Sequence, residues 1–383
     1  GGQLPTSDTL YVERTAILNA RSRRIGKGGT VILWSDEHTV FYGNAYAQGG
    51  DDGGDGGLVE VSGKNILTYD GKADLSAAQG AMGTLLLDPT NIVISSGGDA
   101  FVSGASPYTP TVDNAASVLN VGTLQTALAS ANVIVQTRAT GAQPGNITVD
   151  AAITWASGNT LTLDAHGSII VNQAISGGSV TMIAGTDVQF NANVGGTGTL
   201  ALMPAADGTT IGIGASAAGV FNISAADFPF IQDGWSEIIV GRSTGTATMD
   251  VRTTAAWNDN LTLQSGAGAI NITTAINVGA NNLTFQTDGN IGLSVANAIA
   301  GTGTLNLRQQ TAGANVGLSG AAGALNLNNT EIGRIADGWS MINVGRADGS
   351  GTMTLSGTAS TWKDNVTFLS GTGAIVVGVG QVF

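Results

Sequence analysis

Short runs of alternating apolar and polar residues recur along the chain. Three of them are Leu261-Thr262-Leu263, Leu283-Thr284-Phe285 and Leu305-Asn306-Leu307, each beginning 22 residues after the one before. Such alternation is typical of a β-strand with one buried face, and the Gly, Asn, Asp and Ser residues around each run favour turns. An antiparallel meander also alternates, but it does not readily hold one triplet at a constant period. We therefore expect an all-β solenoid of stacked parallel coils, in which neighbouring coils complete each other's core.

A longer repeat contains these strands. The tetrapeptide at 233–236, Asp-Gly-Trp-Ser, returns 104 residues later at 337–340, and the segment 256–262 returns at 361–367. A fainter third copy surrounds Trp155. These copies predict modules of about 104 residues that arose by duplication. We expect one continuous solenoid with β-helix coils over 1–100, an excursion over 101–145, and repeated modules over 146–383.

The middle region follows a different pattern. Leu124 and Leu128 are four residues apart with Ala127 between them, and Thr123 can cap a helix at this point. We predict one short flanking helix near 122–131. The preceding segment, Ser103–Asn114, contains two prolines and is expected to form a loop on the solenoid.

Composition and charge narrow the functional classes. The 383 residues include 58 glycines, no cysteine, and 14 Lys plus Arg against 27 Asp plus Glu, which gives a net charge of −13. General nucleic-acid binding is therefore not expected, because few cations are present to neutralise phosphates. The absence of cysteine excludes a disulfide scaffold and thiol chemistry. The basic residues near the start form either a solvated loop edge or a docking patch: Arg21, Arg23, Arg24 and Lys27.

Targeting signals are also absent from the sequence as it stands. No apolar run approaches the roughly 18 residues of a membrane span. No signal peptide begins at Gly1. If the protein is secreted, we expect the chain to be a processed or excised piece of a longer polypeptide.

Residues 28–96 carry several motifs in a fixed order. They are Gly-Gly-Thr-Val-Ile-Leu-Trp-Ser-Asp at 28–36, Phe-Tyr-Gly at 41–43, Gly-Gly-Leu-Val-Glu-Val-Ser-Gly-Lys at 56–64, and Gly-Thr-Leu-Leu-Leu-Asp-Pro-Thr-Asn-Ile at 83–92. In this order they resemble the passenger regions of filamentous-haemagglutinin-like exoproteins, the large adhesins of two-partner secretion. The later coils resemble this family more loosely.

The resemblance implies a right-handed parallel β-helix that is exported through an outer-membrane partner transporter. It further implies a secreted or bacterial cell-surface location and a role in adhesion or biofilm. The Asn-Pro-Asn motifs of the family's secretion domain are not found in this sequence. The export route is therefore an expectation from the family, and the chain is expected to lie downstream in a longer polypeptide.

Two groups of residues are candidates for binding or modification. Asp51, Asp52 and Asp55 lie on a glycine-rich segment, where clustered carboxylates either hold Ca²⁺, which prefers oxygen ligands, or form a solvated turn. The pattern Asn-x-Ser/Thr marks possible glycosylation, or else places Asn at strand starts, where stacked amides bond along the coils. Its seven asparagines are Asn146, Asn222, Asn260, Asn271, Asn282, Asn328 and Asn365.

The aromatic and titratable residues also have alternative roles. The repeated tryptophans either plug the core at coil corners or stack on sugars: Trp155, Trp235, Trp257, Trp339 and Trp362. His38 and His166 are far apart in the sequence. Asp70, Asp74 and Asp88 would suit a polysaccharide-active β-helix enzyme if they stacked on adjacent coils. No glycine segment leads from a strand into a helix as a phosphate-binding loop requires. We therefore predict no enzyme activity, no cofactor and no metal.

Three functions compete at this point. The first is an adhesive stalk that contacts host or neighbouring cells, and the second is a subunit that assembles with itself into an extracellular filament. The third is a carbohydrate-active enzyme. The partners expected are other copies of the chain or a cell surface, and the transporter during export.

Overall fold

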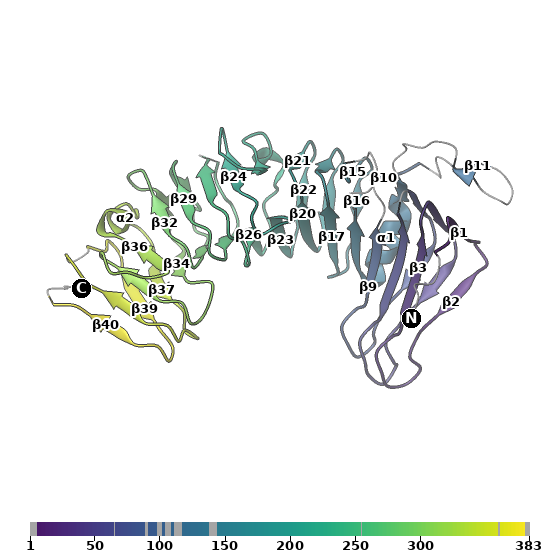
Figure 1. The fold of residues 1–383 in the computed structure, drawn as a ribbon, viewed down its shortest axis with the longest axis horizontal. Coiled ribbons are helices and arrows are strands. Elements are labelled where there is room, and N and C mark those ends of the chain that lie inside the picture. Colours follow the sequence, from purple (N-terminus) through teal and green to yellow (C-terminus); the bar gives the residue numbers. More distant parts are fainter. Residues whose placement is uncertain are drawn as a thin grey trace. The chain divides into compact units, whose positions relative to one another are not determined.

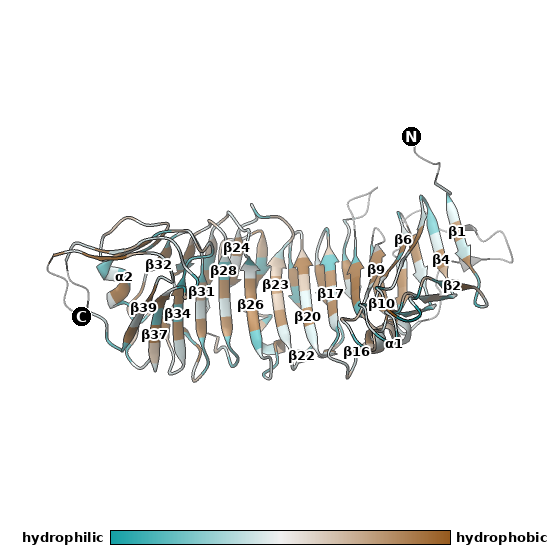
Figure 2. Ribbon diagram, turned by 90° about the horizontal axis from the view of Figure 1, so that it is seen from below, coloured by the Kyte–Doolittle hydropathy of each residue, from teal (hydrophilic) through white to brown (hydrophobic). Residues whose placement is uncertain are grey.

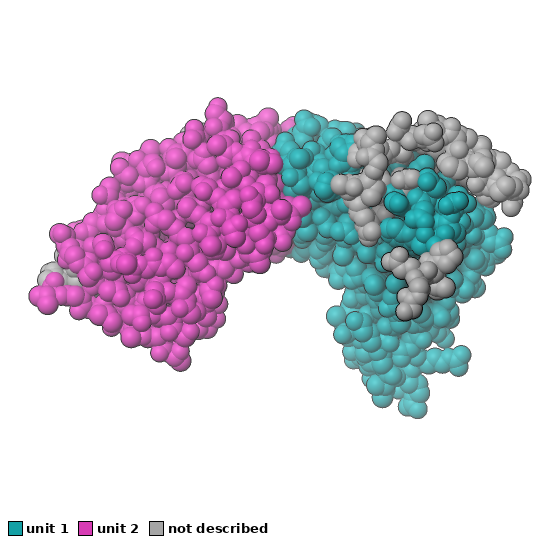
Figure 3. Space-filling view, in the orientation of Figure 1, with its two compact units in different colours: residues 1–198 teal, residues 199–383 magenta. Residues whose placement is uncertain are grey.

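The computed structural model describes residues 6–64, 66–88, 91–97, 102–103, 109–110, 117–137, 144–253, 255–358 and 361–379. The chain divides into two compact units, Gly1–Gly198 and Thr199–Phe383 (Figure 3). Each unit consists mainly of short parallel strands (Figure 1). The predicted all-β parallel solenoid with a short flanking helix is confirmed. The predicted boundaries at residues 100 and 145 stay a prediction.

One sheet of the first unit contains its longest strands. In spatial order these are β3 (Thr30–Ser35), β6 (Leu58–Gly63), β9 (Thr84–Asp88), β14 (Asn132–Gln136), β17 (Thr160–Ala165) and β20 (Ser179–Ala184). Every pair of neighbours is parallel and in register, so that Val133 lies beside Leu85 on one side and Leu161 on the other. Like residues therefore stack from coil to coil.

The other faces of the first unit are built in the same way. One sheet contains β1 (Thr9–Val12), β4 (His38–Phe41), β7 (Ile66–Tyr69), β13 (Ser117–Asn120), β10 (Ile92–Ser95), β15 (Ile147–Val149), β18 (Ile169–Val171) and β21 (Val188–Phe190). Two smaller sheets contain β2 (Ile17–Asn19), β5 (Asn44–Tyr46) and β8 (Lys72–Asp74), and β16 (Ile153–Thr154), β19 (Ile175–Gly177) and β22 (Val194–Gly196). A separate antiparallel pair joins β11 (Val102–Ser103) and β12 (Thr109–Pro110).

The second unit repeats this plan. Its main sheet contains β23 (Thr199–Pro204), β26 (Glu237–Arg242), β28 (Leu261–Ser265), β31 (Leu283–Gln286), β34 (Thr304–Arg308), β37 (Met341–Gly345) and β39 (Val366–Leu369). A second sheet contains β25 (Phe221–Ile223), β24 (Ile211–Gly214), β27 (Met249–Arg252), β29 (Ile270–Ile272) and β32 (Ile291–Leu293). The remaining strands are β36 (Leu325–Leu327), β35 (Val316–Leu318), β38 (Met353–Leu355) and β40 (Ile375–Val377), and the pair β30 (Ile276–Asn277) and β33 (Ile299–Ala300).

The core of each unit follows from the alternation in the sequence. In β17 the odd positions Leu161 and Leu163 are fully buried, whereas Thr160 and Thr162 face outward and are half-buried. The triplets read from the sequence behave alike: Leu261 pairs with Leu283, which pairs in turn with Leu305. Figure 2 shows the resulting bands of apolar and polar residues along the strands. Burial of the apolar side chains, which form one stacked column along each strand face, is the main contribution to stability.

The predicted helix is α1 (Val121–Ser130), and its buried face consists of Leu124, Ala127 and Leu128. Its cap differs from the prediction. Asn120, not Thr123, has extended backbone and accepts hydrogen bonds from the backbone N–H groups of Gly122 and Thr123. The carboxamide of Asn satisfies two of the free N–H groups at a helix start, a task for which Asn is well suited.

The helix belongs to an element that occurs three times. The 3₁₀ helix η1 (Phe228–Phe230) and the short helix α2 (Asn329–Gly333) follow β25 and β36, as α1 follows β13. Asn120 and Asn328 cap α1 and α2, whereas η1 begins after Asp227. Ser224 lies midway between the two asparagines, 104 residues from each, and precedes the turn that leads into η1. In each copy the strand before the helix pairs in parallel with an earlier strand of its own module. The neighbouring pairs are β13 and β10, β25 and β24, and β36 and β35. The run Leu325-Asn326-Leu327 predicts a strand 20 residues after Leu305, in phase with it, but β36 pairs with β35 and not with the main sheet. The strands β13 and β25 were not predicted.

Candidate functional site

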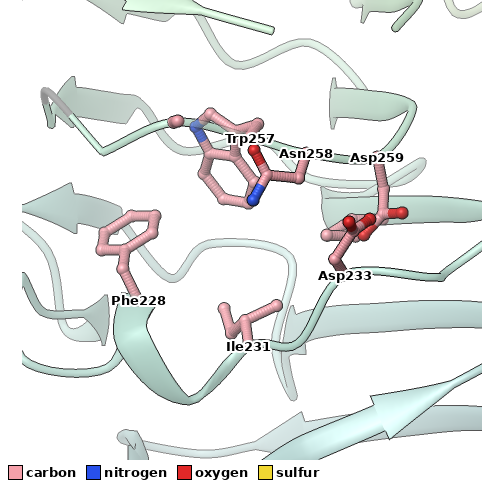
Figure 4. A pocket seen from close by; sticks show the side chains of 8 residues that line it. Phe228, Ile231, Asp233, Trp257, Asn258 and Asp259 are labelled. Atoms are coloured by element: carbon pink, nitrogen blue, oxygen red, sulfur yellow. The ribbon is translucent and has the colours of Figure 1, made fainter.

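The second unit contains a pocket at the junction of the repeated segments. Its lining comes from η1, from the loop that follows η1, from β26, and from the loop that precedes β28. The lining residues are Phe228, Ile231, Asp233, Ile238, Ala256, Trp257, Asn258 and Asp259, and they surround a small cavity of about 20 Å³ that opens to solvent. Figure 4 shows the aromatic rings on one side and two neighbouring carboxyl groups on the other, with Asn258 between them.

The aromatic side of the pocket is formed by a pair of contacting rings. The rings of Phe228 and Trp257 meet edge to face, with centroids 5.1 Å apart and planes at 85°. This is a preferred geometry for aromatic pairs. Trp257 is only 3% exposed, and its indole N–H has no hydrogen-bond acceptor within the described chain. The indole therefore forms a wall of the pocket and does not project from the solenoid.

The acidic side of the pocket is held by the repeated Asp-Gly-Trp turn. Gly234 has φ of 117°, a conformation that a side chain disfavours, and its N–H donates to Asp259 Oδ1 at 3.0 Å. Burial raises the pKa of the Asp259 carboxyl above its ordinary value, and the neighbouring carboxyl of Asp233 contributes to the rise. In the described part of the chain, no Lys, Arg or His side chain forms an ion pair with either carboxyl.

The same connection recurs in the second copy of the module. Gly338, with φ of 120°, donates its N–H to Asp364 Oδ1 at 3.0 Å, and the N–H of Trp339 donates to Asp364 Oδ2 at 3.1 Å. The repeated Asp residues at 259 and 364 thus fix the chain turn of the preceding coil. The bonded residues are 25 positions apart in the first copy and 26 in the second. This contact explains why the Asp-Gly-Trp turn and the later aspartate recur together.

The repeated tryptophans are mostly buried. Trp235, Trp257 and Trp339 are each 3% exposed, which supports the interpretation of core plugs over stacking platforms for sugars. Trp155 and Trp362 are half-buried. The indole N–H of Trp155 donates to the Asn159 carbonyl at 2.9 Å.

The aspartate segment and the basic cluster meet in the first unit. Arg24 Nε lies 3.2 Å from Asp52 Oδ2, and Asp55 Oδ1 accepts from the Ala81 N–H at 2.9 Å. Asp51 instead lines a shallow pocket with Arg21 and Arg23, among other residues. No group of three or more Asp, Glu or His side chains in the described ranges is arranged to hold a metal ion. The three aspartates thus have separate surroundings, and the structure gives the calcium hypothesis no support.

Three of the seven asparagines of the Asn-x-Ser/Thr pattern connect coils. The side-chain oxygens of Asn146, Asn260 and Asn282 accept from the backbone N–H groups of Ser168, Asn282 and Thr304 in the following coil, at 2.9, 2.9 and 2.8 Å respectively. The amide stacking that we expected is therefore replaced here by carboxamide-to-backbone bonds, which satisfy the N–H group that precedes each strand.

The four other asparagines of this pattern have different surroundings. Asn328 caps α2 in a capping box with Glu331. Asn222 and Asn271 lie within β25 and β29 and are half-buried. Asn365, the counterpart of Asn260 in the next module, is exposed, and its carboxamide forms no hydrogen bond within the described chain. Asn282 and Asn328 are also exposed, but their carboxamides are engaged in hydrogen bonds. Glycosylation of any of the seven stays a prediction.

The remaining titratable candidates do not form a common site. Burial lowers the pKa of His38, whose Nε2 lies 3.0 Å from Thr68 Oγ1, whereas His166 is exposed. Asp70 pairs with Arg14 Nη2 at 2.7 Å, and Asp74 accepts from Gln48 Nε2 at 2.9 Å. Asp88 ends β9, and its side chain lies outside the described part of the structure.

The possible stacking of Asp70, Asp74 and Asp88 is wrong. Asp70 directly follows β7, whereas Asp74 and Asp88 lie in β8 and β9, and these three strands belong to three different sheets. The reason is spacing: the three residues span 18 positions, less than the distance between equivalent strands such as β6 and β9, so they follow one another around a coil.

No helix in the described ranges has the length and apolar character needed to span a bilayer. Neither the protein-family models nor the curated proteins include a match to this chain. The resemblance to haemagglutinin-like exoproteins therefore remains a prediction from the motifs at residues 28–92.

Proposed function

We propose that the chain is a structural and adhesive segment of a secreted or cell-surface bacterial β-solenoid protein. The observation that carries the proposal is the in-register parallel stacking in both units. A stack of coils joined by backbone ladders and a shared apolar core is a stiff scaffold, and a stalk that presents binding surfaces needs such stiffness.

The outward faces support this role. Thr284, Asn306 and Asn343 lie side by side on β31, β34 and β37, where Asn306 Nδ2 donates to Thr284 Oγ1 at 3.2 Å and Asn343 Nδ2 donates to Asn306 Oδ1 at 3.0 Å. These bonds link successive coils at the surface. A face of short uncharged polar groups suits a long solenoid, because it avoids the repulsion of like charges stacked about 4.8 Å apart.

The cellular context of the proposal comes from the sequence. Export through an outer-membrane partner transporter agrees with the motifs at residues 28–92 and with the absence of cysteine. A chain without cysteine can be exported in an unfolded state without forming or rearranging disulfides. The partner surface in this proposal is that of a host or neighbouring cell.

Assembly into an extracellular filament is the second candidate. The edge strand β40 carries Ile375, Val376 and Val377, which are 44%, 48% and 50% exposed. An apolar strand edge of this kind favours addition of another strand. That strand comes from a further copy of the chain in the filament hypothesis, or from more of the same polypeptide in the stalk hypothesis.

Catalysis has no place in the proposal. The acidic residues that we considered for a polysaccharide-active enzyme are engaged in separate contacts, Asp70 with Arg14 and Asp74 with Gln48. A screen of the purified chain against acidic and neutral polysaccharides tests this point. Turnover that a single Asp substitution abolishes would contradict it.

A bead assay combined with electron microscopy tests the proposal itself. Beads that carry the folded chain should bind to epithelial or bacterial cells more strongly than beads that carry the same chain after unfolding. Micrographs of the free chain should show isolated particles for a stalk and regular fibres for a filament. Equal cell binding by folded and unfolded chains, without fibres, would contradict both candidates.

A further inference from the structure

The pocket around Trp257 has a counterpart in the next module. Five of its eight lining positions hold the same residue type in both copies: Ile231, Asp233, Ile238, Trp257 and Asp259 correspond to Ile335, Asp337, Ile342, Trp362 and Asp364. The other three positions differ, with Phe228, Ala256 and Asn258 replaced by Ile332, Thr361 and Lys363. The duplication thus gives two versions of one site.

The exchange of Asn258 for Lys363 is the change with chemical consequence. Lys363 Nζ donates a hydrogen bond of 2.7 Å to the carbonyl oxygen of Ile335. Ile335 corresponds to Ile231, which lines the pocket in the other copy. The second copy therefore brings an ammonium group of its own to this position.

The first copy shares five of these eight positions but has no such group. Asn258 is exposed, and its neutral side chain is two atoms shorter than that of lysine. The pocket beside it retains a cavity of about 20 Å³, which is roughly the room that one water molecule or one ammonium group needs. A carbonyl oxygen has two lone pairs, so Ile231 offers an acceptor as Ile335 does.

The charges favour a cation in that space. Asp233 and Asp259 contribute two carboxyl groups, and no cationic side chain of the described chain pairs with them. The rings of Trp257 and Phe228 form the opposite wall, and aromatic faces attract ammonium groups. Two carboxyl groups close together repel each other unless a proton or a cation lies between them.

We propose that this pocket binds the ammonium group of a small primary amine from outside the chain, at the position that Lys363 supplies for itself in the next module. A primary ammonium has three N–H donors, enough for the Ile231 carbonyl and both carboxyl groups. A quaternary ammonium of equal charge has none, so it should bind weakly. The inference goes beyond the scaffold role and can be tested whether or not the chain is an adhesin.

Reciprocal exchange of the two residues provides the test. The probe is n-butylammonium chloride, with tetramethylammonium chloride as the matched cation, and the readout is the indole N–H resonance of each tryptophan in a ¹⁵N–¹H spectrum. Both exchanges, Asn258→Lys and Lys363→Asn, place a residue that the module already accepts at that position. Circular dichroism confirms that each variant is folded.

The expected results differ for each variant. In the native chain, n-butylammonium should shift the Trp257 resonance to saturation and leave Trp362 unchanged. Asn258→Lys should abolish the Trp257 response, and Lys363→Asn should add a Trp362 response. Asp233→Asn, which keeps the side-chain shape, should weaken binding about tenfold or more, because one charged acceptor is lost.

Three results would overturn the inference. One is an unchanged Trp257 response in Asn258→Lys, and another is the absence of any Trp257 response in the native chain. The third is an equal response to tetramethylammonium, which would show that charge alone acts. Should Asn258→Lys not fold, the Asp233→Asn and Lys363→Asn variants decide the matter.

Discussion

Leu283 offers the sharpest test of the stacked core. Its side chain is fully buried on β31 between Leu261 of β28 and Leu305 of β34. Leu283→Ala removes three carbon atoms, about 2.4 kcal/mol of apolar transfer at about 0.8 kcal/mol per carbon. The backbone ladders on both sides prevent the neighbouring leucines from closing the gap, so a cavity penalty adds to this figure. We expect a total loss of about 3–4 kcal/mol, within the usual range for buried leucines.

The adjacent residue provides the matched control. Thr284 faces outward and accepts one hydrogen bond, from Asn306 Nδ2 at 3.2 Å. Thr284→Ala should therefore cost at most about 1 kcal/mol. Because the two substitutions are one residue apart, an indirect effect on expression or on the local segment would influence both variants.

Hydrogen exchange with peptide-level resolution is the appropriate assay, because a stack of coils need not unfold in a single step. Leu283→Ala should lower the opening free energy of β28, β31 and β34 most, and that of more distant coils less. The reasoning would be refuted if both substitutions had equal effects, or if the loss were spread evenly over the unit.

Three further predictions concern close backbone contacts, inter-coil bonds and pH. Gly28→Ala should cost about 2–3 kcal/mol in thermal or chemical unfolding, because the added Cβ would lie 2.0 Å from a backbone carbonyl, whereas Gly158→Ala, with open space around it, should be nearly neutral. Asn282→Ala should cost about 1 kcal/mol through loss of the 2.8 Å bond to the next coil, and Asn365→Ala should cost almost nothing; equal costs would contradict the role of these bonds. The pKa of Asp259 is raised in the folded state, so just above pH 3.8 the folded chain binds more protons than the unfolded chain. The free energy of unfolding of the native chain should therefore increase as pH falls through that window, relative to that of an Asp259→Asn variant in parallel denaturant titrations. A difference between the two chains that stays constant with pH would contradict this prediction.

Much of the fold could be predicted from periodicity because the solenoid is made of local signals. The triplets at 261, 283 and 305 all form strands with the expected face buried, and the helix near 122–131 appears at Val121–Ser130. Its cap was assigned wrongly because Thr123 and Asn120 both suit such a position. Only the backbone conformation shows that the helix begins at the asparagine.

Contacts between distant residues could not be predicted in the same way. The bond from Gly234 to Asp259 joins residues in successive coils, and nothing in either segment alone indicates its partner. The strands β25 and β36 pair in parallel with strands only ten and nine residues earlier, a spacing shorter than the coil period. The period therefore does not reveal β25, and it places β36 in the wrong sheet. The pocket beside Trp257 depends on such contacts between distant residues. The sequence therefore identifies the tryptophan but not the pocket.

Distances between outward residues on successive coils test the central claim most directly. The chain contains no cysteine, so single pairs can be introduced and spin-labelled without background. Labels at Thr284 and at Asn306, Asn343 or Thr367 occupy one register column on β31, β34, β37 and β39. Parallel stacking predicts separations that grow by about 4.8 Å per coil, to about 14 Å for the last pair. Separations that do not increase in this order would show that the coils are not stacked in register.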